Sequence, residues 1–252
     1  MKAIILAAGR GSRMKDKTDI LPKCLTELWN KTLLEWQLNS LKKAGISDIA
    51  IITGYRSEEI RKRQPNLKYF HNDIWDKTNM VATLLKADEW LKTDDCIVSY
   101  ADIIYTSKAV KSLIESKADI AITYYTKFLE LWKERFDNPL DDIETFKKDK
   151  NSNLIEIGHK AKSLSDIEGQ YMGLLKFTPL SWSKISQVLQ SDNLPKSVEK
   201  IDMTSLLSHL LTQNLEIKTI AYDEIFLEVD NPEDLTLYES WTPEQYSILN
   251  ED

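Results

Sequence analysis

The chain has 252 residues, and 42% of them are hydrophobic, which is enough to form a substantial core. Its 40 acidic and 33 basic residues give a formal net charge of −7, and the basic residues are spread along the chain, which argues against a nucleic-acid-binding scaffold. Cys24 and Cys96 lie far apart without neighbouring ligands, so neither a disulfide framework nor a zinc site is expected. The apolar residues 4–8 are too few for a signal peptide or a membrane span, and we expect a cytoplasmic protein that binds no membrane.

Short apolar runs and amphipathic segments alternate along the first half of the chain. The apolar runs predict β-strands at residues 2–6, 48–53, 96–100 and 119–125. Between them we expect helices at residues 32–44, 79–91 and 106–116, the first of which stops at Gly45. This alternation is typical of βαβ units, and it predicts an α/β protein with a three-layer α/β/α fold around a mostly parallel, Rossmann-like sheet.

The alternation breaks near Phe128. Residues 128–170 mix charged, aromatic and turn residues, and the sequence KKDKNSN predicts the loop of a hairpin between strands at 143–146 and 154–157. Strands at 171–177 and 215–221 and helices at 181–191 and 203–213 are expected to follow. The chain has no linker-like stretch, internal repeat or low-complexity tract, so we predict a single domain over residues 1–252.

A glycine-rich turn follows the first predicted strand. Its residues, Ala8-Gly9-Arg10-Gly11-Ser12-Arg13, lie at the carboxyl end of a parallel strand, where open α/β sheets bind ligands. Alternate glycines let backbone N–H groups converge on an anion, and Arg13 adds a bidentate donor for phosphate oxygens. The spacing excludes a dinucleotide-binding G-x-G-x-x-G motif and a P-loop, because the third glycine and the G-K-[ST] sequence are missing. For this segment alone, a tight turn with a surface arginine is the alternative.

A longer match surrounds this turn. Residues 6–14, Leu-Ala-Ala-Gly-Arg-Gly-Ser-Arg-Met, with Pro22-Lys23 at the usual distance, resemble the signature of the nucleotidyltransferase superfamily typified by sugar-1-phosphate nucleotidylyltransferases. One departure is visible, because Asp16 and Lys17 stand where the family often has Pro and Leu. The resemblance implies that the Rossmann-like sheet is a nucleotidyltransferase sheet.

Two acidic sites further along the chain also resemble this family. Asp102 follows the strand predicted at 96–100, where the family places a magnesium-binding aspartate. Glu228 and Asp230 resemble the second metal site, and in a strand these two positions project to one face, so both carboxylates can converge on one cation. Magnesium prefers carboxylate, phosphate and water oxygens, so the resemblance implies an Mg²⁺ cofactor held by these three residues. For Asp230 alone, an N-cap of a helix that begins near Pro232 is the alternative.

The resemblance also implies which residues bind the nucleotide. Lys23, Arg13 and Asp102 are expected to be catalytic, with Arg13 on the β- and γ-phosphates and Lys23 over the α-phosphate. Thr78 and Asn79 stand where related proteins read the base and ribose, and helix capping is an equal alternative for both. The full expected nucleotide-binding set is Leu6, Ala7, Ala8, Gly9, Gly11, Ser12, Arg13, Lys23, Thr78, Asn79 and Asp102.

The acceptor residues are expected in the mixed middle segment, and we assign this role to Trp132, Arg135, Lys160, Gln170 and Tyr171. Lys160 falls where sugar nucleotidylyltransferases hold the acceptor phosphate with a lysine, although the flanking Glu and Pro of that motif are missing here. The indole of Trp132 can face an ammonium group, a contact worth ~0.5–2 kcal/mol. Core packing is the alternative for this tryptophan.

The short chain without a C-terminal β-helix resembles small bacterial cytidylyltransferases. We therefore predict CMP transfer from CTP to a small phosphorylated or phosphono acceptor, such as phosphocholine, 2-aminoethylphosphonate or a phosphoglutamine-like compound, with release of pyrophosphate. Residues 1–125 would be the nucleotide-binding half, 126–235 the acceptor-binding half with a small β insertion, and 236–252 a tail. The alternatives are a sugar-1-phosphate nucleotidylyltransferase that uses dTTP or UTP, and a non-catalytic nucleotide-sensing module. Residues 128–170 suit either a lid or the contact of a homodimer.

Overall fold

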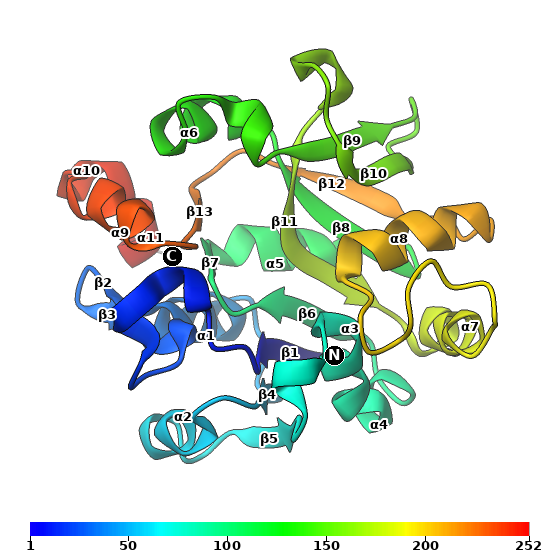
Figure 1. The fold of residues 1–252 in the computed structure, drawn as a ribbon, viewed down its shortest axis with the longest axis horizontal. Helices are drawn as coiled ribbons and strands as arrows, with labels where there is room; N and C mark the ends of the chain where they lie inside the picture. Colours follow the sequence, from blue (N-terminus) through cyan, green and yellow to red (C-terminus); the bar gives the residue numbers. More distant parts are fainter. Residues whose placement is uncertain (252) are drawn as a thin grey trace.

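The computed structural model, which describes residues 1–251, is built around a seven-stranded sheet (Figure 1). In spatial order its strands are β12 (Lys218–Tyr222), β8 (Ile120–Tyr125), β11 (Gln170–Phe177), β6 (Cys96–Tyr100), β1 (Lys2–Ala7), β4 (Ile49–Thr53) and β5 (Lys68–His71). In this sheet β11 alone runs antiparallel to its neighbours, β6 and β8. The predicted mostly parallel sheet is therefore confirmed.

Strand β1 lies between β6 and β4 and is covered on both faces. Ile4 pairs in register with Ala50 of β4 and Val98 of β6, and all three side chains are buried. A continuous apolar run forms such a strand because a parallel sheet is covered by helices on both sides. The glycine turn begins directly after this strand and so lies at the carboxyl edge of the sheet.

Helices cover both faces of the sheet, as the predicted three-layer fold requires. The apolar cluster on one face includes residues of α1 (Leu33–Lys43), α2 (Ser57–Arg63), α5 (Ser107–Glu115) and α6 (Phe128–Arg135). The cluster on the other face includes residues of α3 (Met80–Leu84), α4 (Asp88–Leu91), α7 (Pro179–Leu189) and α8 (Met203–Thr212). Short 3-10 helices span Ser12–Thr18, Lys23–Leu25, Trp75–Lys77, Leu85–Ala87, Pro139–Asp141 and Leu164–Asp166. Within residues 1–251, no helix has both the length and the apolar character needed to span a bilayer.

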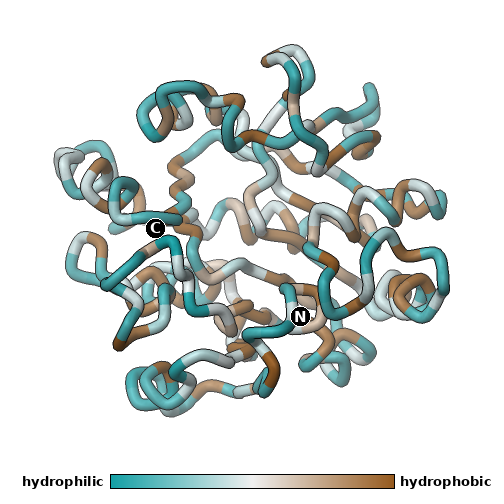
Figure 2. Tube along the Cα trace, in the orientation of Figure 1, coloured by the Kyte–Doolittle hydropathy of each residue, from teal (hydrophilic) through white to brown (hydrophobic). Residues whose placement is uncertain are grey.

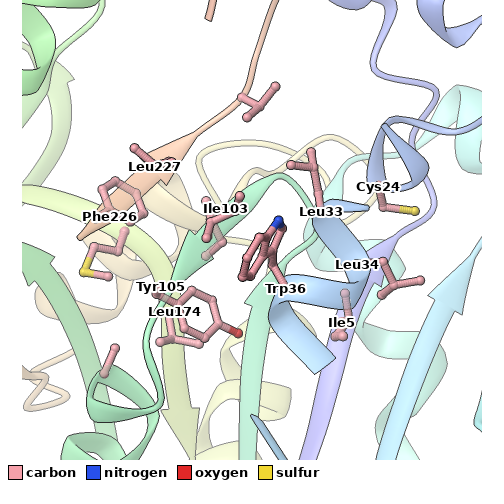
Figure 3. Packing of buried hydrophobic residues seen from close by; sticks show 14 of the residues in the cluster. Ile5, Cys24, Leu33, Leu34, Trp36, Ile103, Tyr105, Leu174, Phe226 and Leu227 are labelled. Carbon is pink, nitrogen blue, oxygen red and sulfur yellow. The ribbon is translucent and has the colours of Figure 1, made fainter. Parts of the chain in front are cut away.

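The first cluster packs closely around Trp36 (Figure 3). Its indole is 2% exposed, and its Nε1 donates a hydrogen bond to the carbonyl of Leu28 at 3.0 Å. Figure 3 shows Leu33, Ile103 and Tyr105 around this ring. Outside the core, hydrophilic residues predominate on the peripheral turns (Figure 2).

The N-terminal half of the structure follows the predicted elements closely, with one difference. Helix α1 begins with a capping box, in which Glu35 and Thr32 each bond the other's backbone N–H, and it ends before Gly45, as expected. The single helix predicted at 79–91 is instead divided into α3, a 3-10 turn and α4. The break lies at Ala87, whose φ and ψ of −102° and 21° interrupt the regular helix.

The middle segment contains the predicted hairpin, as β9 (Glu144–Lys148) and β10 (Leu154–Lys160). The Asp149 side chain closes its loop by accepting the backbone N–H groups of Asn151 and Asn153, both at 2.8 Å. The segment also contains α6, which the sequence reading did not predict.

The last residues of the chain fold back onto an early hairpin. Strand β13 (Phe226–Glu228) pairs antiparallel with β7 (Ile103–Tyr105), and α9 (Pro232–Glu239), α10 (Pro243–Tyr246) and α11 (Ile248–Glu251) follow. The hairpin of β2 (Glu27–Leu28) and β3 (Lys31–Thr32) turns at Trp29 and Asn30, which both have positive φ. The Trp29 ring stacks on Tyr246 with a centroid distance of 3.9 Å, so the residues expected to be a tail are docked beside the start of the chain.

Candidate functional site

A cavity of about 320 Å³ lies at the carboxyl edge of the sheet. It is lined by all eleven residues expected to bind the nucleotide: Leu6, Ala7, Ala8, Gly9, Gly11, Ser12, Arg13, Lys23, Thr78, Asn79 and Asp102. The fold brings them together because β1 and β6 are adjacent and parallel, so the glycine turn after β1 and the segment ending at Asp102 after β6 meet at one edge. Asp230 also lines the cavity, from the loop after β13.

The glycine turn fits tightly against the stem of Lys23. Gly11 has a φ of 73°, and a Cβ atom built on it would lie 2.6 Å from the Cβ of Lys23. Glycine is required here for both reasons, since other residues rarely adopt this conformation and any side chain would displace the lysine. The turn thereby fixes where the Lys23 ammonium group points.

The Lys23 ammonium lies between two carboxylates. Its Nζ donates a hydrogen bond of 2.8 Å to Asp102 Oδ2 and another of 2.8 Å to Asp230 Oδ1. Burial acts to lower the pKa of Lys23, but the charges of the two aspartates outweigh it and raise the pKa above the ordinary value. Lys23 is therefore a fixed positive charge.

Asp230 is surrounded by cations. The carboxylate is 5% exposed, and Arg13 Nη2 lies 3.0 Å from its Oδ1. Burial acts to raise the pKa of Asp230, and Lys23 and the neighbouring arginines lower it below the ordinary value. Asp230 is not an N-cap, because Asn231 caps α9 by accepting the backbone N–H of Asp234. The capping alternative for Asp230 was therefore wrong.

Glu228 takes a different position from the one predicted. Strand β13 ends at Glu228, so the argument that Glu228 and Asp230 share one face of a strand does not hold. The Glu228 carboxylate accepts a hydrogen bond from Arg135 Nη1 at 3.3 Å. Burial and the adjacent Asp230 carboxylate raise the pKa of Glu228 well above its ordinary range, which favours the protonated form. Glu228 is thus a poorer candidate for a cation ligand than Asp102 or Asp230.

Asp102 and Asp230 suit a magnesium ion. Asp102 Oδ1 is buried in the structure without a hydrogen-bond partner, while its Oδ2 accepts from Lys23. Among residues 1–251, no group of three or more His, Cys, Asp or Glu side chains is arranged to hold a metal by itself. Two carboxylates completed by substrate phosphates and water are a usual Mg²⁺ ligand set, so the residues present fit this ion.

A second cavity of about 210 Å³ adjoins the first and shares four lining residues with it: Arg13, Met80, Tyr100 and Asp230. Gln170 and Tyr171, two of the expected acceptor residues, line it, and Tyr171 meets Tyr100 edge to face at 6.0 Å. The remaining charged lining is acidic: Asp142, Glu144, Asp202 and Glu228. This cavity therefore favours a ligand that carries a positive charge.

The other three expected acceptor residues lie outside both cavities. Trp132 is fully buried and donates its Nε1–H to Asp142 at 3.0 Å, so it is a packing residue. The Arg135 side chain is 0% exposed and pairs with Glu228 at the end of β13 and with Asp234 in α9. Lys160 is exposed at the end of β10, opposite Glu144. The structure thus does not bring Trp132, Arg135 and Lys160 to either cavity, because α6 turns its aromatic face inward and Lys160 lies at the exposed end of β10.

Part of the wall of the first cavity is formed by Trp75, which no sequence motif predicted. Trp75 packs so closely on Gly54 that a Cβ atom at Gly54 would lie 2.6 Å from the Cβ of Trp75. The fully buried Asn72 donates one amide hydrogen to Thr78 Oγ1 at 2.9 Å and the other to Thr83 Oγ1 at 3.0 Å. No motif in the sequence marks these residues, because their roles depend on contacts between the segments after β4 and β5.

Asn79 caps a helix and also lies at the first cavity. Its Oδ1 accepts the backbone N–H of Met80 at 2.8 Å, which caps α3, and its Nδ2 donates to the Lys200 carbonyl. The residue still lines the first cavity. The prediction that the Asn79 side chain caps a helix is therefore confirmed.

Comparisons with known proteins agree with this site. Residues 3–154 match the MobA-like NTP transferase domain. The CTP:phosphoglutamine cytidylyltransferase of Campylobacter jejuni is 38% identical over 248 residues, which cover 93% of this chain and 98% of that protein. A choline-phosphate cytidylyltransferase of Streptococcus pneumoniae is 40% identical over 92 residues, which cover 35% of this chain and 40% of that protein.

Solved structures show the same fold at low sequence identity. The inositol-1-phosphate CTP transferase of T. maritima superimposes with a TM-score of 0.75 at 17% identity, covering 99% of this chain and 95% of that one. The CTP:phosphocholine cytidylyltransferase of Streptococcus pneumoniae gives a TM-score of 0.71 at 19% identity, covering 94% and 97%.

Proposed function

Because this chain belongs to the MobA-like NTP transferase family, we propose that it is a cytidylyltransferase that transfers CMP from CTP to a small phosphorylated or phosphono acceptor. The observation that carries the proposal is the meeting of Arg13, Lys23, Asp102 and Asp230 around one cavity whose wall is the glycine turn. This set can hold a triphosphate and neutralise charge beside it. CTP is favoured as the nucleotide because a relative that is 38% identical over 93% of this chain is named for its use of CTP.

The triphosphate is assigned to the glycine turn. The backbone of Gly9 to Ser12 and the Arg13 guanidinium bind the β- and γ-phosphates, and Lys23 faces the α-phosphate. Asp102 and Asp230 would hold Mg²⁺, which would supply positive charge against the triphosphate oxygens. The Arg13 side chain is 69% exposed and contacts Asp230 Oδ1 at 3.0 Å, so an incoming phosphate reaches its guanidinium from the solvent side.

The chemical step forms a bond between an acceptor oxygen and the α-phosphorus of CTP and breaks the bond from that phosphorus to the bridging oxygen of the β-phosphate. Pyrophosphate leaves with the bonding electrons. The acceptor oxygen is already anionic at neutral pH, since the second phosphate pKa is near ~6, so no side chain has to remove a proton. Catalysis is therefore assigned to positioning and to the positive charges of Lys23 and Arg13.

The acceptor is assigned to the second cavity and is expected to carry an ammonium group. Its acidic lining, which includes Asp142, Glu144 and Asp202, can face such an ammonium group. Relatives named for phosphoglutamine and choline phosphate support the same class. The cytoplasmic location of the protein and its assembly as a homodimer remain predictions.

Pyrophosphate release with Mg²⁺ tests the proposal, with CTP, UTP, dTTP and ATP each crossed with glutamine phosphate, phosphocholine, 2-aminoethylphosphonate, glycerol phosphate and glucose-1-phosphate. We expect turnover with CTP and an amine-bearing acceptor. Turnover confined to a sugar phosphate with UTP or dTTP would make the protein a sugar nucleotidylyltransferase instead. If no pair of nucleotide and acceptor gives pyrophosphate release, the proposal is contradicted.

A further inference from the structure

Arg135, the last residue of α6, has a completely buried side chain. Its guanidinium carbon lies 4.8 Å from the ring centroid of Trp132 and 5.1 Å from that of Phe136. Burying a guanidinium is costly unless charged partners surround it. Its partners should therefore show what this residue does.

Three acidic side chains, Glu228 at the end of β13 and Asp230 and Asp234 after it, meet this guanidinium. Nε and Nη2 donate to the two carboxylate oxygens of Asp234 at 2.9 and 3.1 Å, a bidentate pair. Nη1 donates to Glu228 at 3.3 Å, and Nη2 lies 3.5 Å from Asp230 Oδ2. A planar fork is needed to reach all three, and the single ammonium of a lysine could not reproduce it.

Asp234 links the Arg135 guanidinium to the backbone of Asp230. Its Oδ2 accepts the backbone N–H of Asp230 at 2.7 Å and that of Asn231 at 3.2 Å, and its side chain is 2% exposed. Arg135 thus holds Asp230 twice, through the backbone by way of Asp234 and directly at Oδ2. The other carboxylate oxygen, Oδ1, faces Lys23 and Arg13.

We infer that Arg135 is a positioning residue that fixes the Asp230 carboxylate so that it can bind the divalent cation together with Asp102. The inference rests on the proposed function and deepens it. It also joins α6, in the expected acceptor-binding half, to the cation ligands. Outer partners of metal ligands commonly change metal affinity by about 10- to 100-fold when removed.

The test measures CTP affinity by calorimetry twice for each full-length variant, once with Mn²⁺ and once with EDTA. Wild type should bind CTP more tightly with Mn²⁺ than with EDTA. A change in the ratio of these two affinities between variants reports the cation site, because the Mn²⁺–CTP complex in solution is the same for all variants. Arg135→Met should reduce this ratio about 10- to 100-fold while CTP affinity in EDTA stays the same. Arg135→Lys should recover part of the ratio.

The matched control is Trp132→Phe, which keeps an aromatic ring beside the Arg135 guanidinium, loses the bond to Asp142 and leaves the ion pairs of Arg135 with residues 228–234 in place. It should leave the ratio unchanged. A purely structural role of Arg135 would weaken CTP binding equally with Mn²⁺ and with EDTA. A ratio equal to that of wild type in Arg135→Met would overturn the inference.

If Arg135→Met does not fold, as judged by circular dichroism, Arg135→Lys is measured instead, and a ratio equal to that of wild type would again overturn the inference. If wild type binds CTP equally well with Mn²⁺ and with EDTA, the proposed cation site and this inference are both wrong. If wild type does not bind CTP at all, the proposed function itself is wrong.

Discussion

Lys23 Nζ lies 2.8 Å from Asp230 Oδ1, although 207 positions separate the two residues in the chain. The contact joins the glycine-turn region to the segment after β13, and both ends line the first cavity. Because the Lys23 side chain is only 12% exposed, its charge acts on the cavity with little screening by solvent.

Lys23→Ala should remove most of the catalytic rate. Losing a fixed positive charge at the α-phosphate should lower kcat by about 100-fold or more, with a smaller change in KM. Steady-state pyrophosphate release measures both constants. Lys62→Ala, which removes an exposed lysine of α2, is the control and should keep wild-type rates. Near-normal turnover of Lys23→Ala would contradict the role assigned to this lysine.

Asp102→Asn should also lower kcat, by more than about tenfold, because a neutral amide binds Mg²⁺ much less well than a carboxylate. The measurement is a Mg²⁺ titration of pyrophosphate release, in which the midpoint should move to higher Mg²⁺. Asp223→Asn, an exposed site paired with Lys108, removes the same charge and should leave the midpoint in place. An unchanged midpoint for Asp102→Asn would exclude Asp102 as a ligand.

Gly11→Ala separates backbone strain from displacement of the lysine. Gly11 and Gly45 both have positive φ, so alanine at either position should cost about 1–2 kcal/mol of unfolding free energy. At Gly45 an added Cβ meets nothing within 4 Å, whereas at Gly11 it collides with the Lys23 side chain. Urea unfolding should show the loss from backbone strain in both variants and a further loss in Gly11→Ala, while pyrophosphate release should fall for Gly11→Ala only. Equal activity of the two variants would argue against the packing role of Gly11.

Asp202 should give stability a dependence on acid pH. It caps α8 through the backbone N–H of Ser205, at 2.7 Å, and pairs with Lys196 at 2.6 Å. Burial acts to raise its pKa, and the bonds from Lys196 and Ser205 lower the pKa to about 2. Since this value is below the unfolded pKa of about 3.9, the stabilisation is fully present above about pH 4 and is lost as pH falls toward 2.

Asp202→Asn keeps a capping side chain and removes only the charge. It should therefore destabilise the protein by about 0.5–1 kcal/mol at neutral pH and have no effect near pH 2. Urea unfolding over a pH series measures this difference. Asp192→Asn, at an exposed loop position, should show no comparable pH dependence. A difference from wild type that persists unchanged at low pH would show that the pairing with Lys196 does not contribute.

The sequence predicted the parts of the site that lie on local segments. The nine residues from Leu6 to Met14 follow one strand directly, so their pattern and their place at the sheet edge could be read together. The same holds for Asp102 after β6. Lys23 could be assigned from the resemblance alone, but its contact with Asp230 could not, because it depends on how β13 pairs with β7.

The middle segment was harder to predict because its roles depend on which way a helix faces. Trp132 and Arg135 are three residues apart on α6, so both face inward together, one toward the core and the other toward the acidic segment after β13. A mixture of charged and aromatic residues looks the same in sequence whether it lines a cavity or packs behind one. The acidic lining of the second cavity comes from three separate segments, which contain Asp142 and Glu144, Asp202, and Glu228, and no local pattern reveals that they meet.

The pairing of β13 with β7 also sets an order of events when the chain folds. Strands β1, β4 and β6 can assemble from the first hundred residues, but Asp230 takes its place beside Lys23 only after β13 has added to β7. Contacts between such distant segments form slowly because a long loop must close first. A growing chain that already displays the glycine turn therefore still lacks a carboxylate of its site, and activity should appear only after residues 226–230 have left the ribosome.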